Sequence, residues 1–480
     1  MLTKIGSFAV TAAVALLVLG TSARGARAPV VNAENESGVA RTINVNGPVV
    51  DDDNPFFADL GVNGRRCVTC HQPDQNMTIT PAGVRARFDA TDGTDPLFRT
   101  NDGANSPLAD VSTLAARRAA YSMLLDKGLI RVGIPIPADA EFELADVNDP
   151  YGYAGHNDNG NELSLFRRPL PATNLRFLST VMWDGRETAR RGSAEAIHFD
   201  LAQQANNATT GHAQAPAPID AATREAIVRY QMGNFTAQVF DREAGALRSA
   251  GARGGPEALV EEAFVFGAND PLGCDANGEN CTGSNEHFTP IIFDEYDAWA
   301  SLPGRGRNAA RRAVARGQAL FNTLEIPLTD VGGINDDFAA ILKGQPVRGT
   351  CGVCHDTPHA GDHSVPAPLD IGIAEPPVPG STRTRDGLDV AGLPVYTLRH
   401  KISGEIKVVT DPGRALITGK WRDVGRFKGP ILRALAGRGP YFHNGSAATL
   451  GDVVDFYDRR FDLRLTEEQK NDLVMFLRTL

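Results

Sequence analysis

The five-residue pattern Cys-x-x-Cys-His occurs twice in this chain, as Cys67-Val-Thr-Cys70-His71 and as Cys351-Gly-Val-Cys354-His355. This spacing is typical of c-type haem attachment, because two thiols one turn apart can bond the two vinyl groups while the next imidazole reaches the iron. A zinc site needs four ligands, and neither half offers a second cysteine pair with suitable partners. A thioredoxin-like redox motif does not need the histidine. The duplication therefore predicts two covalent haems with His71 and His355 as axial ligands.

The other two of the six cysteines, Cys274 and Cys281, enclose a short acidic loop. In an exported protein, a local disulfide is the favoured interpretation of such a pair. The acids between them resemble a calcium loop only faintly, because the loop lacks a bidentate glutamate at the right place. We therefore expect Cys274 and Cys281 to be joined.

The first 28 residues have the pattern of an export signal. Lys4 supplies the positive charge, residues 5–19 are apolar, and small residues follow up to Ala28. An uncleaved membrane anchor is the alternative, but the apolar run is short for a spanning helix, which needs about 20 residues. We therefore expect a signal peptide at 1–28, a periplasmic location and no integral membrane segment after cleavage. Export agrees with c-type haem, which is attached outside the cytoplasm.

The length, composition and net charge of the chain indicate a globular protein that does not bind nucleic acid. The 480 residues correspond to two or three domains, and the 42 % hydrophobic content is ordinary for a globular chain. The formal net charge of −10 argues against nucleic acid as a partner, because phosphate binding needs clustered lysine and arginine.

The order of segments predicts a leader and two larger parts. Residues 29–55 are polar and predict a flexible leader, and residues 301–306 have the composition of a linker between segments 56–302 and 303–480. Apolar residues from Ile227 to Phe240 recur at roughly helical spacing, and residues 307–322 predict a basic helix.

The last helix is marked by a capping-box pattern from Thr466 to Gln469. Its buried stripe is expected to consist of Leu473, Val474, Leu477 and Leu480. Met475, the only methionine of the second segment, is expected in the core rather than on an iron. Neither segment of the sequence shows a convincing alternation of apolar and polar residues of the kind that marks a β-strand. We therefore expect helices and loops to dominate, and the expected fold class is all-α.

Several stretches beyond the haem motifs resemble the bacterial dihaem cytochrome c peroxidase family, which includes the MauG branch. They are Met182-Trp183-Asp184-Gly185-Arg186-Glu187, Asp411-Pro412-Gly413-Arg414, Phe427-Lys428-Gly429-Pro430-Ile431-Leu432-Arg433 and Pro440-Tyr441-Phe442-His443-Asn444-Gly445. Their order matches the family, the likeness covers most of the chain beyond residue 55, and residues 89–165 look like an insertion. The resemblance implies two cytochrome c-like haem domains with long loops, a peroxidatic one at 56–302 and an electron-relay one at 303–480.

Two residues near the haems acquire roles from this resemblance. Trp183 matches a tryptophan placed between the haems, where an indole can carry an oxidising equivalent; a core tryptophan is the alternative. The family's peroxidases place methionine on the second iron, and an ungapped count from Leu450 puts that position on Tyr457. Tyrosine there resembles MauG, which oxidises tryptophans of a partner protein. A phenolate lowers the haem reduction potential, whereas the alternative for Tyr457 is a half-buried core residue.

The distal side of the first haem departs from the family. An ungapped count from Trp183 puts the family's glutamine on Gln204 and its acid–base glutamate on Gln214. An amide cannot relay a proton, although heterolysis of peroxide requires a group that does so. His212 is two residues earlier, and histidine is the side chain suited to proton exchange near neutral pH. The alternatives for His212 are an exposed loop residue or one that acts through another group.

The resemblance also implies an interdomain calcium ion, held by an asparagine before the Trp-Asp-Gly-Arg motif. The matching position is Arg168, and a guanidinium there would replace the charge of the ion. Backbone oxygens near Arg438 and Pro440 remain, but a carbonyl site needs more than two oxygens. Calcium is therefore a doubtful cofactor.

The other histidines have plainer interpretations. His443 is expected to hydrogen-bond a haem propionate or the fold rather than to bind iron, and His359 and His363 are expected to be loop or propionate contacts. Some peroxidases hold a sixth ligand before the Trp-Asp-Gly-Arg motif, where this chain has His156 in a Gly/Asn-rich loop. An exposed side chain is the favoured interpretation of His156.

Three function classes remain open. The first is a periplasmic peroxidase that reduces hydrogen peroxide with electrons from a small cytochrome c or cupredoxin. The second is a MauG-like oxidase that acts on a protein or organic substrate, which Tyr457 favours. The third is a non-catalytic dihaem electron carrier, which needs strong ligands on both faces of each iron and is disfavoured by the shortage of methionine.

Overall fold

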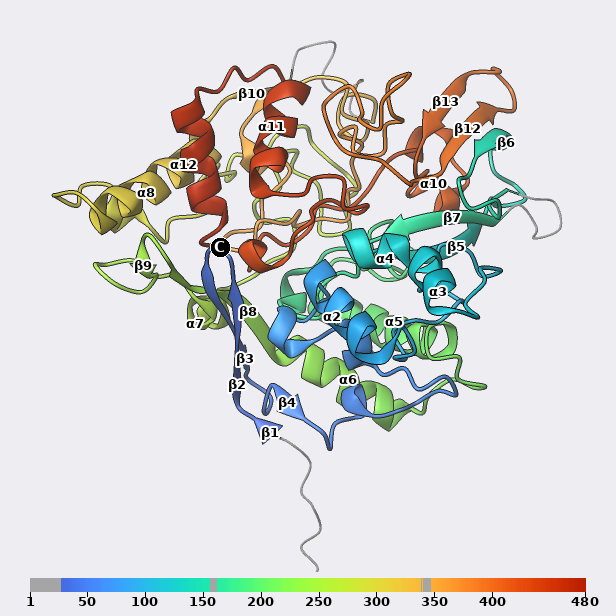
Figure 1. Ribbon diagram of the computed structural model, residues 1–480. Helices are drawn as coiled ribbons and strands as arrows, with labels where there is room; N and C mark the ends of the chain where they lie inside the picture. The colour runs from blue at the N-terminus through green and yellow to red at the C-terminus, as the bar shows by residue number, and fades with distance from the viewer. Residues whose placement is uncertain (1–26, 156–161, 338, 340–346) are drawn as a thin grey trace, which may run out of the picture.

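The computed structural model describes residues 27–155, 162–337, 339 and 347–480 (Figure 1). Almost all of the predicted signal peptide lies outside these residues, and so does His156. Within the described part of the chain, no helix is both long and apolar enough to cross a membrane.

The helices are short, and most begin at a side chain that caps the first turn. They are α1 (Cys67–Cys70), α2 (Pro81–Thr91), α3 (Leu114–Ala120), α4 (Ser122–Lys127), α5 (Ala194–Gly211), α6 (Ala221–Gly233), α7 (Pro256–Glu261), α8 (Arg307–Thr323), α10 (Ala415–Thr418), α11 (Leu450–Arg460) and α12 (Glu467–Leu477). Ser193 and Asp220 accept hydrogen bonds from free backbone N–H groups at the starts of α5 and α6.

The strands pair only in antiparallel fashion. They are β1 (Arg27–Ala28), β2 (Val30–Asn35), β3 (Gly38–Asn44), β4 (Val50–Asp51), β5 (Ile130–Pro135), β6 (Phe142–Asn148), β7 (Glu162–Arg167), β8 (Asn234–Asp241), β9 (Gly245–Ala246), β10 (Ile326–Leu328), β11 (Val347–Gly349), β12 (Val395–His400) and β13 (Ile406–Val409). The sheet orders are β1-β4, β5-β7, β10-β11, β13-β12-β6 and β2-β3-β8-β9.

The predicted all-α fold class is therefore wrong. The fold is mixed: in the part of the chain that the structure describes, 30 % of residues are helical and 17 % lie in strands, which form five sheets. The two larger sheets join strands that are far apart in the sequence, β3 with β8 and β6 with β12. A strand of this kind depends on a partner that its local pattern does not reveal, because strand preference is set mainly by packing against neighbours.

The segment 29–55 is not the flexible leader that its polarity predicts. About half of it forms β2 and β3, a hairpin whose second strand pairs with β8 along its whole length. Alternate residues of β3 are buried, including Ala40 and Thr42, and the Thr42 hydroxyl lies 2.9 Å from the Thr236 hydroxyl. The polar side chains on this face are satisfied by other polar side chains of the sheet, which composition alone cannot show.

The predicted helix through Phe240 ends earlier than expected. The chain leaves α6 at Gly233 and continues directly as β8, which lies between β3 and β9. Gly233 contacts β3 so closely that a Cβ there would lie 2.3 Å from Asn44 Oδ1. Pairing with β3 therefore overrides the helical spacing of the apolar residues that follow.

The helices expected in the second segment are confirmed. α8 covers the predicted basic stretch, and α12 begins with the capping box formed by Thr466 and Gln469. Leu473, Met475 and Leu477 lie in one buried cluster with residues of α8, so Met475 packs in the core as predicted. In Figure 1, α8, α11 and α12 lie together, and the C-terminus ends beside β8.

The two predicted segments share a sheet and several contacts. β6 from the insertion pairs with β12 from the second segment, and β12 also pairs with β13. The Leu480 carbonyl accepts a hydrogen bond from the Gln238 N–H of β8 at 3.1 Å. The predicted insertion at 89–165 contributes α3, α4, β5 and β6, together with part of β7, rather than loop alone.

A glycine allows the close packing of α8 on α12. A Cβ on Gly317 would lie 1.9 Å from the backbone oxygen of Asp472. We expect Gly317→Ala to lower the free energy of unfolding by about 1–3 kcal/mol, the usual cost of overpacking, although alanine favours helix. Urea unfolding followed by circular dichroism measures the change.

The matched control for this prediction is Gly211→Ala at the end of α5. No atom lies within 4 Å of a Cβ at Gly211, so alanine should be neutral or slightly stabilising there. If Gly317→Ala is as stable as Gly211→Ala, the two helices do not depend on that close contact.

Candidate functional site

The first Cys-x-x-Cys-His motif borders a cavity in the N-terminal part, here called the first cavity. Cys67 and Cys70 begin and end α1, and both line the cavity together with His71. His71 Nδ1 lies 3.2 Å from the Met77 carbonyl oxygen, which leaves Nε2 available to a metal. Burial lowers the pKa of His71 to about 4, so the imidazole is neutral, as a metal ligand must be.

The first cavity has apolar walls and one polar corner. The walls include Leu170, Leu175, Leu178, Val181, Leu201 and Ile227, and the corner holds Arg65, Asp102, Gln204 and His212. This combination suits a large apolar cofactor with a polar reaction partner on one side.

The second motif borders a larger apolar cavity, here called the second cavity. Cys351, Cys354 and His355 line it, together with leucine, isoleucine, valine and phenylalanine side chains. His355 Nδ1 lies 2.6 Å from the Gly361 carbonyl oxygen, and burial lowers the pKa of His355 to about 4. The two motifs thus present their histidines in the same way, with one ring nitrogen bound to backbone and the other free.

Tyr457 lies on α11 and lines the second cavity with His355. Burial raises the pKa of its phenol, and the nearby thiols of Cys354 and Cys351 raise it further. Among the residues that the structure describes, none forms a hydrogen bond with the Tyr457 hydroxyl. The half-buried Tyr457 side chain thus lines the same cavity as the second Cys-x-x-Cys-His motif.

A third cavity, here called the middle cavity, has lining residues in common with each of the other two. It shares Leu170, Leu175 and Leu178 with the first cavity, and it shares Trp183, Lys428 and Tyr441 with the second. Trp183 is only 8 % exposed, and its indole Nε1–H donates to the Arg168 carbonyl oxygen at 2.8 Å. The Trp183 carbonyl in turn accepts the Lys428 N–H at 2.9 Å, so both its ring and its backbone are held in place.

A buried ionic network holds the turn that follows Trp183. The Arg167 guanidinium contacts Asp184 and donates two hydrogen bonds to Asp411, at 2.8 and 2.9 Å. Burial by itself would raise the pKa of Asp184, but Arg167 and Arg186 hold it at about 2. The Trp-Asp-Gly-Arg turn is therefore joined to the strand β7 and to the Asp411 turn of the second segment.

The polar corner of the first cavity contains an acid that sequence reasoning missed. His212 Nδ1 lies 2.5 Å from Asp102 Oδ2, and Asp102 also contacts the Arg65 guanidinium. Burial by itself would raise the pKa of Asp102, but Arg65 and His212 hold it below its usual range. Asp102 belongs to the 89–165 insertion, where no spacing pattern identifies it.

The predicted distal residues are not all brought together. Gln204 on α5 and His212, which follows the end of that helix, both line the first cavity. Gln214 is exposed instead, and its side-chain oxygen accepts a hydrogen bond from Asn63 at 3.2 Å. The structure thus places Gln204 and His212, but not Gln214, among the residues that line the first cavity.

Comparison with known proteins finds similar curated sequences of one kind, whereas the solved structures that it finds are only weakly similar. No family model matches the chain. The chain is 31 % identical over 246 residues to the cytochrome-c peroxidase IdrP1 of Denitromonas iodatirespirans, and 30 % identical over 253 residues to IdrP1 of Pseudomonas sp. (strain SCT). The curated proteins that this chain is similar to are thus cytochrome-c peroxidases. Each match covers 47 % of this chain and 54 % of the relative, so the chain spans about half the length of the curated relatives it matches.

A further relative and two solved structures complete the comparison. IdrP2 of Denitromonas iodatirespirans is 30 % identical over 143 residues, which is 28 % of this chain and 36 % of the relative. A MauG-like protein associated with microbial copper homeostasis aligns at a TM-score of 0.30 and 15 % identity, over 66 % of this chain and 76 % of that chain. Kuenenia stuttgartiensis hydrazine synthase aligns at a TM-score of 0.29 and 15 % identity, over 84 % of this chain and 93 % of that chain. These TM-scores are too low to establish a shared fold.

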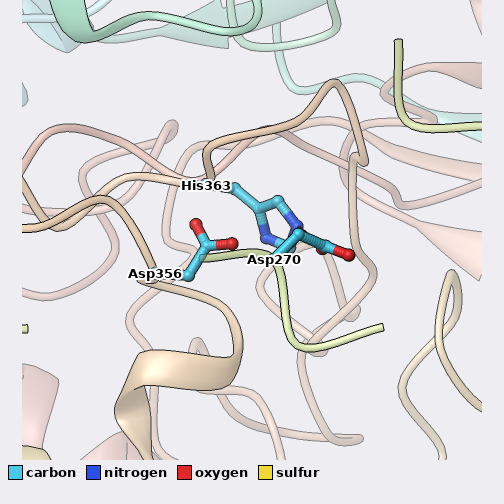
Figure 2. A group of neighbouring side chains, drawn as sticks. All are labelled: Asp270, Asp356 and His363. Atoms are coloured by element: carbon cyan, nitrogen blue, oxygen red, sulfur yellow. Dashed lines mark ion pairs between the residues drawn. The ribbon is translucent and has the colours of Figure 1, made fainter. Parts of the chain in front are cut away.

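Asp270, Asp356 and His363 form a buried group behind the second cavity. Figure 2 shows the His363 ring beside both carboxylates, and the candidate ligand atoms of the three residues lie within 4.8 Å of one another. Burial would lower the pKa of His363, but Asp356 and Asp270 raise it to about 9. His363 Nε2 lies 3.4 Å from Asp270 Oδ1, so the protonated imidazole forms a buried ion pair with that carboxylate.

The disulfide supports this group. Cys274 and Cys281 are bonded to each other, and the Cys274 N–H donates to Asp270 Oδ2 at 2.8 Å. The closed loop therefore holds Asp270 near His363, which lies at the edge of the second cavity.

The remaining predicted histidines lie apart from the ligand positions of the two motifs. His443 is fully buried, stacks on Phe427 with ring centroids 3.9 Å apart, and lies 6.3 Å from the Trp183 ring. His359 Nδ1 lies 3.2 Å from Glu295 Oε1, so its ring is used in an ion pair.

The Arg167 network gives a prediction for stability. Arg167→Met keeps most of the side-chain volume but leaves buried Asp411 without its guanidinium and Asp184 with Arg186 alone; breaking a buried ion pair typically costs about 3–5 kcal/mol. The difference from the parent should shrink as the pH falls toward 2, because the stabilising ionisation of Asp184 is lost as the pH approaches its low folded-state pKa. Thermal and urea unfolding at several pH values measure both effects.

Arg399→Met is the control, because Arg399 pairs with Glu143 on the surface. An exposed pair contributes less than about 1 kcal/mol, so this variant should unfold close to the parent. Equal stabilities for the two variants would show that the Arg167 network does not hold the turn.

Proposed function

We propose that this protein is an exported, periplasmic dihaem c-type oxidoreductase that reacts with hydrogen peroxide at the first haem. Oxidising equivalents then pass through Trp183 to the second haem. The observation that carries the proposal is that each outer cavity is lined by one Cys-x-x-Cys-His motif, and that the middle cavity, bordered by Trp183, shares lining residues with both. The kinship with cytochrome-c peroxidases supports the same reaction class.

The residues present fit two covalent haems. Cys67, Cys70 and His71 would hold the first haem, and Cys351, Cys354 and His355 would hold the second. Buried Arg438 has no hydrogen-bond partner for Nε or Nη2, and Lys428 borders both the middle and the second cavity. Such cations are suited to the propionate carboxylates of a haem. Bound haem supplies the iron at which peroxide is reduced and an iron that supplies electrons.

His212 is the proposed acid–base residue. Reduction of one hydrogen peroxide to two water molecules takes two electrons and two protons, and O–O cleavage needs a group that moves a proton between the two oxygens. With Nδ1 held by Asp102, His212 keeps Nε2 for this transfer at the first cavity, where Gln204 can hydrogen-bond the peroxide. Asp102, fixed by Arg65, acts as the positioning residue for His212.

Replacement of His212 tests this role. We expect His212→Gln to slow the reaction of the oxidised protein with peroxide by about 100-fold or more, the usual contribution of a general acid–base group. Asp102→Asn should lower the same rate less, because the imidazole remains. Stopped-flow measurement of the peroxide rate, with cyanide affinity as a check on the haem site, separates the effects.

His198→Gln is the matched control for this series. His198 also lies on α5 and also pairs with a carboxylate, Glu225, at 2.8 Å, but on the protein surface away from the first cavity. A His212→Gln variant that reacts with peroxide as fast as His198→Gln would contradict the acid–base role.

The haem content is the second test of the proposed function. Mass spectrometry of the denatured protein should show the polypeptide plus two haems, and a Cys67→Ala/Cys70→Ala variant should carry one. A peroxide-reacting enzyme should also show one high-spin and one low-spin haem by electron paramagnetic resonance. One haem or none in the parent would refute the dihaem proposal, and two low-spin haems would favour an electron carrier.

Tyr457 is the proposed sixth ligand of the second haem, and it favours a MauG-like oxidase as the alternative function. The side chain shares the second cavity with His355, and the only methionine of this segment lies in the core. An anionic oxygen ligand lowers the reduction potential of a haem, so the oxidised protein would react with peroxide without prior reduction. A MauG-like enzyme would then oxidise a protein or organic substrate, whereas a peroxidase would take electrons from a small cytochrome c or cupredoxin.

Two substitutions test the ligand. Tyr457→Phe should leave the second haem five-coordinate or water-bound, and Tyr457→Met should raise its reduction potential because a neutral sulfur stabilises the reduced iron. Absorption spectra and redox titration provide the measurements. Tyr441→Phe is the control, since the Tyr441 hydroxyl also lies at this cavity but donates to the Leu435 carbonyl at 2.8 Å. An unaltered low-spin spectrum in Tyr457→Phe would end the ligand proposal.

A further inference from the structure

The Arg168 side chain lies in a cradle of backbone oxygens between the two halves of the molecule. Nη1 donates to the carbonyls of Lys127 and Gly128, at 3.0 and 3.3 Å. Nη2 is directed at the carbonyls of Ile79, Arg438 and Gly439, at 2.9, 3.1 and 3.5 Å. One buried guanidinium thus joins three segments that are far apart in the sequence.

The charge of this guanidinium is balanced by carbonyl dipoles rather than by an acid. Among the described residues, no carboxylate lies within ion-pair distance of Arg168. Burial lowers the pKa of Arg168 to about 10, so the group remains protonated at neutral pH. Buried cations are normally paired with anions, so a cation held by several carbonyl oxygens alone resembles a bound metal ion in its surroundings.

The cradle is closed around the guanidinium. Gly128 adopts a positive φ of 62°, and a Cβ at this position would lie 2.1 Å from Arg168 Nη1. Calcium takes about six to eight oxygen ligands, usually with carboxylates among them. Here the space among the carbonyls is filled by a cation, and a second positive charge beside it would be repelled. The calcium ion that the family resemblance implies therefore does not fit this site.

The cradle is linked directly to Trp183. The Arg168 carbonyl accepts the indole N–H of Trp183, and the Arg168 N–H donates to the His443 carbonyl at 2.6 Å. Displacement of the guanidinium would move the backbone group that orients the indole.

We propose that Arg168 is a built-in cation that takes the place of a metal ion at this junction, so that the protein neither binds nor needs calcium there. Its side chain holds the three backbone segments together, and its backbone positions Trp183. The proposal concerns an ion site rather than the reaction with peroxide, so it stands or falls separately from the proposed function.

The first experiment uses the purified haem-loaded protein. Removal of divalent ions with a chelator should leave its melting temperature and haem spectrum unchanged, and calcium titration should show no heat of binding at the junction. A chelator-sensitive melting temperature that one equivalent of calcium restores would overturn the proposal.

The second experiment exchanges the guanidinium for a neutral oxygen donor. Arg168→Asn leaves the same carbonyls around a space with no cation, so its melting temperature should fall in chelator and rise by several degrees with added calcium. Arg168→Lys, which keeps a positive charge, should stay insensitive to calcium. A folded Arg168→Asn variant that is indifferent to calcium would contradict the view that this is a cation site.

Arg85→Asn is the matched control. The Arg85 Nη1 also donates to a backbone carbonyl, that of Leu125 at 2.9 Å, but to that one carbonyl alone. This variant should not acquire a calcium response. If Arg168→Asn does not fold, the chelator and calcium measurements on the parent protein still decide the question.

Discussion

Two consecutive buried guanidinium groups hold the region between the haem motifs together. Arg167 joins the carboxylates of Asp184 and Asp411, whereas Arg168 joins backbone carbonyls from three separate segments. Trp183 lies between these two anchors, because its indole bonds the Arg168 carbonyl and its own chain continues into Asp184. A transfer route that runs through one side chain needs that side chain fixed, and here both neighbours in space are charged groups that are costly to displace.

The two outer cavities differ in a way that suits different tasks. The first has a polar corner in which Asp102 contacts His212. The side chains of that corner can exchange protons with a molecule in the cavity. The second is mostly apolar, and its polar lining besides the Cys-x-x-Cys-His motif includes Thr350, His363, Lys428, Tyr441 and Tyr457. An apolar wall offers few groups for proton transfer, whereas a polar corner favours bond cleavage with proton transfer.

Local signals in the sequence were sufficient for some elements and misleading for others. The capping box at Thr466 and the basic stretch of α8 depend on neighbouring residues only, and both are confirmed. The all-α fold class and the flexible leader at 29–55 are wrong, because β3 exists through its pairing with β8, about 190 residues away along the chain. The predicted domain boundary at residue 302 stays a prediction. β6 and β12, which lie on opposite sides of that boundary in the sequence, pair in one sheet.

What the sequence by itself determined is the pair of candidate haem-attachment sites: each Cys-x-x-Cys-His motif places its cysteines and histidine within five residues, so chain geometry alone brings them together. It also identified Tyr457 and Arg168 as departures from the family, but not what surrounds them. Only the tertiary structure placed Asp102 against His212, enclosed Arg168 in carbonyls, and moved Gln214 away from the first cavity. The physical reason is that these contacts join residues from separate segments, and their energies depend on burial and partners that exist only after the chain has folded.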